Sequence, residues 1–236
     1  VMEFMGPGIA GLSMDFRNGI DVMTTETTCL TTIWSTDTTV KDYLELHRRP
    51  EAYREMKPGD LAYYDGAVVV DLDKVESMIA MPFHPSHVYT IKELNEGGRD
   101  LLEEIEKQAV DMLDNKELSL GLADKYYDGK MHCDQGLIAG CSGGLYENLV
   151  AAAHILKGKS IGNERFAFSV YPSSHPIYME LMRNGALADL MDAGAVVRSA
   201  FCGPCFGAGD TPNNKGFSVR HTTRNFPNRE GSKPGK

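Results

Sequence analysis

The sequence predicts an α/β fold in which helices cover a parallel sheet. Short apolar or β-branched runs alternate with segments of helical periodicity between residues 137 and 197, and the loops between them are short. Glycines end several of the helical segments, as is common at the carboxyl ends of helices. Strands and helices that alternate through short loops form right-handed crossovers, so we expect the strands to be parallel.

Local patterns predict the individual elements of this part of the chain. β-branched and apolar runs indicate buried strands, and apolar residues spaced by three or four positions indicate helices. We expect strands at residues 137–139, 165–170 and 195–197, and helices at 145–156, 177–184 and 188–193, which end near Gly158, Gly185 and Gly194.

Residues 99–113 have the most regular helical pattern in the chain. Apolar side chains recur at three- and four-residue intervals, with charged residues between them. We expect the glutamates of this segment to form a solvated face. The apolar positions are Leu101, Leu102, Ile105, Ala109, Met112 and Leu113, and the glutamates are Glu103, Glu104 and Glu106.

The amino-terminal part of the chain is less regular. Residues 19–40 are rich in threonine, and its β-branched side chain favours a strand. Asp37 can cap a helix that runs to about His47. Residues 48–60 contain prolines and a glycine and are expected to be a linker, whereas three consecutive valines predict a strand at residues 67–72.

The composition gives no sign of a polyanionic partner. The 236 residues carry a net charge of -9, with acidic and basic side chains interspersed. We therefore expect neither nucleic acid nor an anionic membrane as a partner. The sequence starts without a basic-then-apolar leader and has no apolar run near about eighteen residues, so we expect a cytoplasmic protein.

The cysteines indicate a metal or redox site in a reducing compartment, because five is an odd number for a disulfide framework. Cys202 and Cys205 form a Cys-x-x-Cys pair within reach of one metal centre, and Cys141 can complete a set of three. An iron–sulfur cube normally takes four cysteines, so a cube held by three leaves one iron open to water or substrate. Cys29 and Cys133 are expected to be small buried apolar side chains.

The predicted sheet gives the three cysteines a common position. Cys141 and Cys202 each follow a predicted strand by a few residues, and ligands of open α/β sheets gather at the carboxyl ends of strands. Neighbouring glycines let the backbone approach a bulky cluster, where amides can hydrogen-bond its sulfurs. These glycines are Gly140, Gly143, Gly144, Gly203, Gly207 and Gly209.

Two other interpretations of the cysteines remain open. Cys-Gly-Pro-Cys is also the redox pair of thioredoxin-like proteins, where it begins a helix, but residues 206–212 predict a loop. A structural zinc site could combine Cys141, Cys202 and Cys205 with His221, because three cysteines and one histidine are a known zinc set.

Further motifs lie in a fixed order along the chain. Cys-Gly-Pro-Cys-x-Gly is followed about twenty residues later by Arg-Asn-Phe-Pro-Asn-Arg, and Cys141 follows Ile-Ala-Gly. The amino terminus contains Glu-Phe-Met-Gly-Pro-Gly, and residues 81–86 are Met-Pro-Phe-His-Pro-Ser. Together these motifs resemble those of the aconitase and isopropylmalate isomerase superfamily of iron–sulfur hydro-lyases, and the resemblance extends over nearly the whole chain.

The resemblance implies a domain organisation. Residues 51–236 would form a three-layer α/β/α domain of the aconitase type that carries the cluster cysteines, and residues 1–50 would be the carboxy-terminal part of a second α/β domain. It also implies a helix within residues 19–40, where the threonines alone favour a strand. The sequence starts and stops abruptly beside motifs, so we expect the remaining domains of the same protein to lie outside this chain.

The resemblance also implies a reaction, the reversible dehydration and rehydration of a hydroxy di- or tricarboxylic acid. A [4Fe-4S] cluster on the three cysteines would act as a Lewis acid on the substrate hydroxyl. Arg224, Arg229 and Asn225 would bind substrate, because arginine offers planar, bidentate donors for carboxylates. Glu3 would lie near the open iron. The family's base is a serine of a carboxy-terminal domain, so we expect no turnover from this chain alone.

Two departures from the family's motifs leave the substrate open. Family members usually have Cys-Thr-Asn-Ser where this chain has Cys141-Ser142-Gly143-Gly144, and an asparagine where this chain has Thr223. A different function is an iron-responsive RNA-binding protein or a non-catalytic cluster-binding protein, because related proteins that lose their cluster can bind RNA. The acidic composition offers no basic groove in support of RNA binding.

Overall fold

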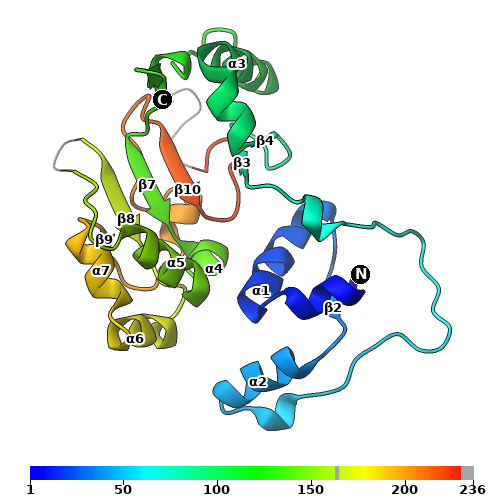
Figure 1. Ribbon diagram of the computed structural model, residues 1–236. Helices are drawn as coiled ribbons and strands as arrows, with labels where there is room; N and C mark the ends of the chain where they lie inside the picture. Colours follow the sequence, from blue (N-terminus) through cyan, green and yellow to red (C-terminus); the bar gives the residue numbers. More distant parts are fainter. Residues whose placement is uncertain (163–164, 230–236) are drawn as a thin grey trace. The chain divides into compact units, whose positions relative to one another are not determined.

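The computed structural model describes residues 1–162 and 165–229 (Figure 1). The chain divides into two compact units, Val1–Val75 and Glu76–Lys236. The domain boundary that the family resemblance implies, between residues 50 and 51, is a different division from this one and stays a prediction. In the described part of the chain, no helix is both long and apolar enough to cross a membrane.

A pair of parallel strands and two helices make up the first unit. β1 (Met2–Phe4) pairs with β2 (Thr32–Trp34), with Glu3 opposite Ile33. The predicted helix after Asp37 is confirmed as α2 (Thr38–Leu46), which ends before His47. The other elements are α1 (Met14–Met23) and the 3-10 helices η1 (Pro7–Gly11), η2 (Thr24–Thr27), η3 (Pro50–Ala52) and η4 (Leu72–Lys74).

The threonine-rich segment 19–40 is part helix and part strand. The strand favoured by its threonines is present only as β2, and α1 and η2 occupy the beginning of the segment, where the family resemblance implies a helix. Thr24 donates its hydroxyl to the carbonyl of Asp21 at 2.8 Å, and Thr27 donates to the carbonyl of Thr24 at 2.6 Å. Such bonds to the preceding turn let a β-branched residue remain in a helical backbone.

A buried arginine joins the two helices of the first unit. Arg17 on α1 is 2% exposed, and it donates to the two carboxylate oxygens of Asp37 at 3.1 and 2.6 Å. The same guanidinium donates to the carbonyls of Ile9 and Leu12. The bond from Arg17 holds the pKa of Asp37 below its usual range. Moving α1 away from α2 would leave the buried Arg17 charge without its partner, which is strongly destabilising. The pair therefore fixes α1 against α2.

The strand predicted at residues 67–72 is wrong. Residues 67–71 have no regular secondary structure, and residue 72 begins η4. The side chains of Val68 and Val69 are 88% and 94% exposed. A β-branched run becomes a strand only where another strand pairs with it, and in this unit β1 and β2 pair with each other.

A four-stranded parallel sheet is the centre of the second unit. Its strand order is β10-β7-β8-β9, and all three pairings are parallel. Figure 1 shows β7 between β10 and β8. The predicted α/β class and the parallel sheet are therefore confirmed. The strands are β7 (Gln135–Ile138), β8 (Ala167–Val170), β9 (Val196–Val197) and β10 (Ser218–His221), of which β10 has no counterpart among the predicted strands.

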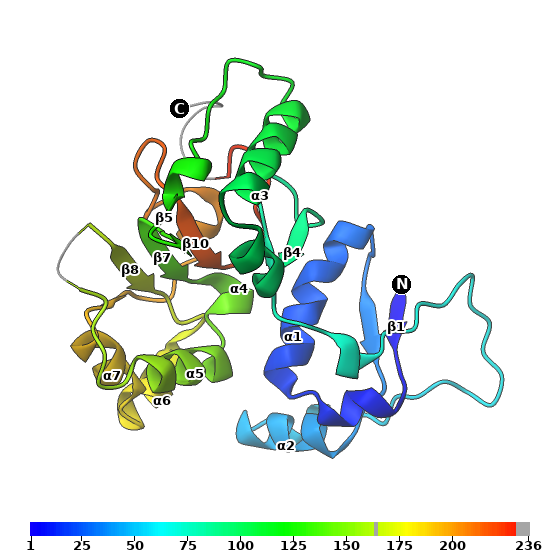
Figure 2. The same ribbon diagram turned by 45° about the horizontal axis from the view of Figure 1, so that its top comes forward.

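Three helices pack beside this sheet and bury its largest core (Figure 2). The side chains at the centre of the core, Leu149, Val170, Leu181 and Leu190, are 0% exposed. The helices are α5 (Tyr146–Leu156), α6 (His175–Arg183) and α7 (Ala186–Asp192), which confirms the three predicted helices. The second helical layer of a three-layer domain stays a prediction.

A second core forms around α3 (Ile91–Met112), which contains the helix predicted at residues 99–113. The helix begins earlier than predicted, at a capping box of Thr90 and Glu93, and it is kinked at Gly98, where φ is 53°. Its apolar side chains pack against Met81 and Leu122. Around it lie β3 (Met78–Ala80), β4 (Val88–Thr90), η5 (Ala123–Lys125), β5 (Tyr126–Tyr127) and β6 (Lys130–Met131).

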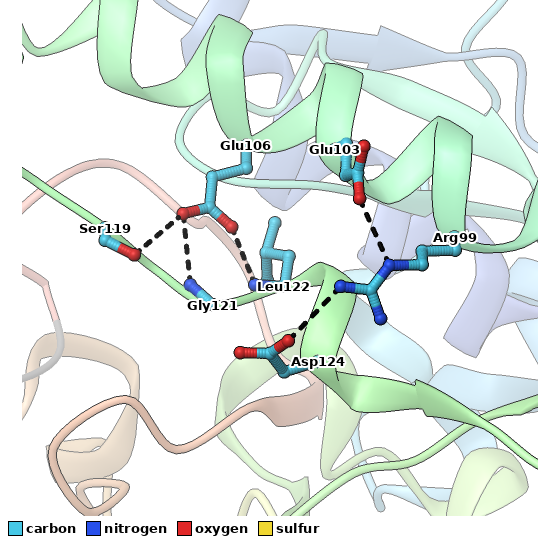
Figure 3. Close-up of polar contacts among 7 residues, drawn as sticks. All are labelled: Arg99, Glu103, Glu106, Ser119, Gly121, Leu122 and Asp124. Carbon is cyan, nitrogen blue, oxygen red and sulfur yellow. Dashed lines mark hydrogen bonds and ion pairs between the residues drawn. The ribbon is translucent and has the colours of Figure 1, made fainter.

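One glutamate of α3 holds a loop in place (Figure 3). The Glu106 carboxylate accepts hydrogen bonds from the backbone N–H groups of Gly121 and Leu122 at 3.1 and 2.8 Å, which Figure 3 shows. The backbone N–H of Leu120 donates to it at 2.7 Å. Ser119 adds its hydroxyl at 3.3 Å. Burial by itself would raise the pKa of Glu106, but these donors outweigh it and hold the pKa below its usual value.

The expectation of a solvated glutamate face is therefore only partly right. Glu103 and Glu104 are 58% and 52% exposed and pair with the neighbouring cations Arg99 and Lys107. For Glu106 the expectation is wrong, because the loop after the helix folds back onto it. Helical periodicity contains no information about that loop.

We expect Glu106→Ala to lower the free energy of unfolding by about 2 kcal/mol, because three backbone donors lose their acceptor. Glu103→Ala removes an exposed ion pair and should cost at most about 0.5 kcal/mol. Urea unfolding at neutral pH measures both values. The folded-state pKa of Glu106 is lowered, so its contribution is complete above the ordinary value of 4.5 and is lost as pH falls through the folded value. Equal losses in the two variants would contradict the anchoring role.

Candidate functional site

The predicted site residues of the second unit lie beyond the carboxyl ends of the parallel strands. Cys141 lies on the short helix α4 (Gly140–Gly143), directly after β7. Cys202 and Cys205 lie at the short 3-10 helix η6 (Gly203–Phe206), which follows β9. Because all four strands are parallel, these turns leave the same edge of the sheet, and α4 contacts η6 there.

A close backbone approach brings the two cysteine-bearing turns together. A Cβ atom at Gly140 would lie only 2.5 Å from the sulfur of Cys205, and φ at Gly140 is +82°. Any residue other than glycine would be strained at this φ, and its Cβ would push the Cys205 sulfur away. The sulfur of Cys205 therefore lies against the backbone next to Cys141.

The three thiols differ in their surroundings. The Cys205 side chain is buried at 5% exposure, whereas Cys141 and Cys202 are exposed. Burial, followed by the neighbouring thiols of Cys202 and Cys141, raises the pKa of Cys205 to about 11, and a hydrogen bond from the Thr223 backbone acts in the opposite direction. These effects show that the three thiols share one local environment.

The donor chemistry of this environment fits an iron–sulfur cluster, because thiolates are the usual ligands of such clusters. In residues 1–162 and 165–229, no group of three or more His, Cys, Asp or Glu side chains is placed to hold a single metal ion. A cube is wider than one ion, so its ligands stand farther apart. Nothing in the described residues favours the zinc alternative with His221.

The geometry also bears on the redox alternative and on the other cysteines. After η6, residues 207–217 contain turns and irregular structure, as expected for this loop, and not the helix that follows a thioredoxin-like pair. Cys29 and Cys133 are partly buried, and burial raises the pKa of the Cys133 thiol. All five cysteines are free thiols in the structure.

The predicted arginine loop follows β10 and touches the cysteine turn. The Nε of Arg229 donates to the carbonyl oxygen of Cys205 at 2.9 Å. Partial burial and the charge of Arg229 lower the pKa of Arg224, so the two guanidinium groups are close enough to repel each other. Two neighbouring cations at the edge of a sheet can bind an anion with two carboxylates.

The two remaining predicted residues have observed partners of their own. Asn225 donates its amide to the carbonyl of Met81 at 2.7 Å, and its buried Oδ1 has no hydrogen-bond partner in the described structure. Glu3 lies on β1 in the first unit and accepts a hydrogen bond from the Tyr64 hydroxyl at 2.6 Å. Substrate binding by Asn225 and a position of Glu3 beside a cluster stay predictions.

Several polar residues beside the cysteine turn were not expected from the sequence. Arg220 on β10 and Gln135 on β7 are hydrogen-bonded to each other, and both contact the carbonyl oxygen of Asp210. The Tyr171 hydroxyl donates to the carboxylate of Asp210 at 2.5 Å. The alternation of Ser218 and Arg220 was a weak signal for β10, because residues two apart point to the same face of a strand.

In the folded, metal-free protein, we expect iodoacetamide to alkylate Cys205 at least about tenfold more slowly than Cys141 or Cys202 at pH 8. The Cys205 thiol is buried and its pKa is raised, so little of it is thiolate at that pH. Peptide mass spectrometry over time measures the three rates. The difference should disappear in urea, and equal rates in the folded protein would contradict the observed burial.

Comparison with known proteins agrees with these motifs. The whole chain, residues 1–236, matches the aconitase family (aconitate hydratase). The 2,3-dimethylmalate dehydratase large subunit of Eubacterium barkeri is 30% identical over 231 residues, which are 98% of this chain and 47% of that protein. The 3-isopropylmalate dehydratase large subunits of Clostridium kluyveri and Clostridioides difficile are 29% and 26% identical, over 98% of this chain and 46% and 47% of those proteins.

The chain therefore spans about half the length of the curated relatives that it matches. These relatives are dehydratases, that is, hydro-lyases of one family. The family match covers every residue of the chain, and the cysteine and arginine motifs that suggested the family meet at one edge of a parallel sheet. This chain belongs to the aconitase family.

Proposed function

We propose that this chain is the cluster-binding part of a hydro-lyase that reversibly removes water from a hydroxy-carboxylate. In this proposal Cys141, Cys202 and Cys205 hold a [4Fe-4S] cluster. The observation that carries it is the approach of the two cysteine-bearing turns, in which the sulfur of Cys205 lies against the Gly140 backbone. Family membership supports the same chemistry, because the relatives named above are dehydratases.

The chain's own side chains would bind and orient the substrate. Arg224 and Arg229 would bind carboxylates through paired N–H donors. Asn225 would offer its buried Oδ1, which accepts no hydrogen bond from the described residues, to a donor on the substrate. Glu3 would exchange a proton or hydrogen-bond the departing water. When bound, the cluster supplies a Lewis acid for the substrate hydroxyl.

We favour a substituted malate as the substrate. The names of the relatives specify dimethylmalate and isopropylmalate, which carry one hydroxyl and two carboxylates. Two neighbouring guanidinium groups match the two carboxylates of such a substrate.

The base and part of the pocket would come from outside this chain. The relatives are named large subunits, and the chain covers 46–47% of their length. We therefore propose a partner that supplies the base, either the remaining domains of the same protein or a separate small subunit. The exposed thiols of Cys141 and Cys202 favour a reducing compartment, so we propose the cytoplasm.

Anaerobic reconstitution with iron and sulfide tests the cluster site. We expect about four irons per protein and visible absorbance in the wild type, and loss of both in Cys202→Ser, because a thiolate ligand is removed. Cys29→Ser is the matched control, since Cys29 lies outside the second unit, and it should bind iron like the wild type. Equal iron content in the two variants, or binding of zinc alone, would contradict the proposal.

Substrate binding by the arginine loop can be tested in the assembled enzyme. We expect Arg224→Lys to lower kcat/KM by about 10- to 100-fold, because lysine keeps the charge and loses the paired donors. Arg183→Lys is the control, since Arg183 is 67% exposed on α6, and its kcat/KM should not change. An unchanged kcat/KM in Arg224→Lys would remove this arginine from the site.

A further inference from the structure

A polar cluster behind the cysteine turn has no part in the chemistry proposed above. At its centre, the guanidinium of Arg220 donates to the carbonyl oxygen of Pro204 at 2.9 Å and to that of Asp210 at 2.5 Å. Pro204 lies between Cys202 and Cys205 in the sequence. One side chain on β10 therefore binds both ends of the segment 204–210 that carries the buried thiol.

The guanidinium is itself held in a fixed orientation. Its Nη2 also donates to Oε1 of Gln135 at 2.9 Å, and its Nε donates to the Ser218 hydroxyl at 2.8 Å. Gln135 is 8% exposed, and its amide donates to the same Asp210 carbonyl at 3.0 Å. Several acceptors at fixed angles match the planar donors of arginine, and a lysine ammonium cannot reproduce this arrangement.

A third strand fixes the far end of the segment. Tyr171 directly follows β8 and is 7% exposed, and its hydroxyl donates to the Asp210 carboxylate at 2.5 Å. Burial and this bond raise the pKa of Tyr171 to about 12. Asp210 is thereby bound through its carbonyl to residues of β7 and β10, and through its carboxylate to the residue after β8.

Burial holds only part of the cysteine turn, because Pro204 and Cys205 are buried while the flanking aromatic side chains are not. The aromatic side chains on either side of it, Phe201 and Phe206, are 55% and 54% exposed. The turn is a single 3-10 helix of four residues, Gly203–Phe206. Hydrogen bonds to its carbonyls, from Arg220 to Pro204 and from Arg229 to Cys205, add directional contacts to this burial.

We propose that Arg220 is a positioning residue for the cluster, because it fixes residues 204–210 so that the thiols of Cys202 and Cys205 stay aligned with Cys141. This inference rests on the proposed cluster site and extends it to a residue that touches neither substrate nor cluster. Partners that orient metal ligands typically change metal affinity by about 10- to 100-fold when they are replaced.

The first measurement follows the bound cluster in the full-length protein. After anaerobic reconstitution, we expect Arg220→Met to lose iron to a chelator about tenfold faster than the wild type. Arg220→Lys should resemble Arg220→Met, because the charge alone does not bind several acceptors. Arg183→Met removes an exposed arginine of the same unit and should lose iron at the wild-type rate. A wild-type rate in Arg220→Met would overturn the proposal.

The second measurement needs no cluster and separates a positioning role from a general loss of stability. In the metal-free Arg220→Met variant, iodoacetamide should alkylate Cys205 about tenfold faster than in the metal-free wild type. The partly buried Cys133 of the same unit should react at the wild-type rate. If Cys133 also reacts faster, the unit has unfolded. The variant Tyr171→Phe, which removes only one hydroxyl, then tests whether the polar cluster holds the Cys205 turn in a folded unit. Faster alkylation of Cys205 alone in that variant supports the proposal, and an unchanged rate overturns it.

The two measurements also separate this proposal from the proposed function. If the wild type takes up no cluster, the cluster site fails, but the alkylation rates still show whether Arg220 holds the turn. If the cluster forms and neither Arg220 variant changes its retention or the Cys205 rate, the cluster site stands and the role of Arg220 is wrong.

Discussion

The contact between the Cys205 sulfur and the Gly140 backbone is the constraint on which the cysteine site depends. The strand order β10-β7-β8-β9 places β8 between the strands that precede the two cysteine turns. The turn after β9 must therefore cross the end of β8 to reach Gly140. It can do so because every strand points to the same edge, and because Gly140 leaves space for a sulfur at 2.5 Å from where a Cβ would lie. The site is thus a product of sheet topology as much as of the cysteine motif.

The surroundings of the Cys205 thiol favour its protonated form, a preference that the proposed cluster would have to reverse. Burial and two neighbouring thiols raise the pKa of Cys205 to about 11, although an arginine of the next loop donates to the Cys205 carbonyl. Ionising three adjacent thiols would require positive charge in direct contact with the sulfurs, which a metal centre provides. In the proposed site this positive charge would come from the cluster, and Arg224 and Arg229 would bind the carboxylates of the substrate.

Sequence reasoning succeeded where structure is decided locally and failed where it is decided by a distant partner. Periodicity and stop signals located α3, α5, α6 and α7, and the apolar runs located β7, β8 and β9. The valines at 68–70 failed as a strand because no strand pairs with them, and β10 was missed because its pairing with β7, 83 residues away at Ser218 and Gln135, makes it a strand. The cysteines and arginines were found by residue type, spacing and resemblance. Arg220 and Tyr171 were missed because most of their partners lie in other elements, among them the carbonyls of Pro204 and Asp210 and the Asp210 carboxylate, which no local pattern reveals.

Close backbone contacts explain why two glycines follow Cys141-Ser142 in this chain. A Cβ atom at Gly143 would lie 1.7 Å from the carbonyl oxygen of His221, and one at Gly144 would lie 2.3 Å from that of Tyr171. A side chain at either position would therefore collide with the backbone at the end of β10 or directly after β8, so this backbone requires both glycines. The Thr223 backbone, two residues after β10, also hydrogen-bonds the Cys205 thiol. The motifs that this chain resembles carry asparagine at positions 143 and 223. At both positions the contacts in this chain are made by the backbone, so no amide side chain is available there to a substrate.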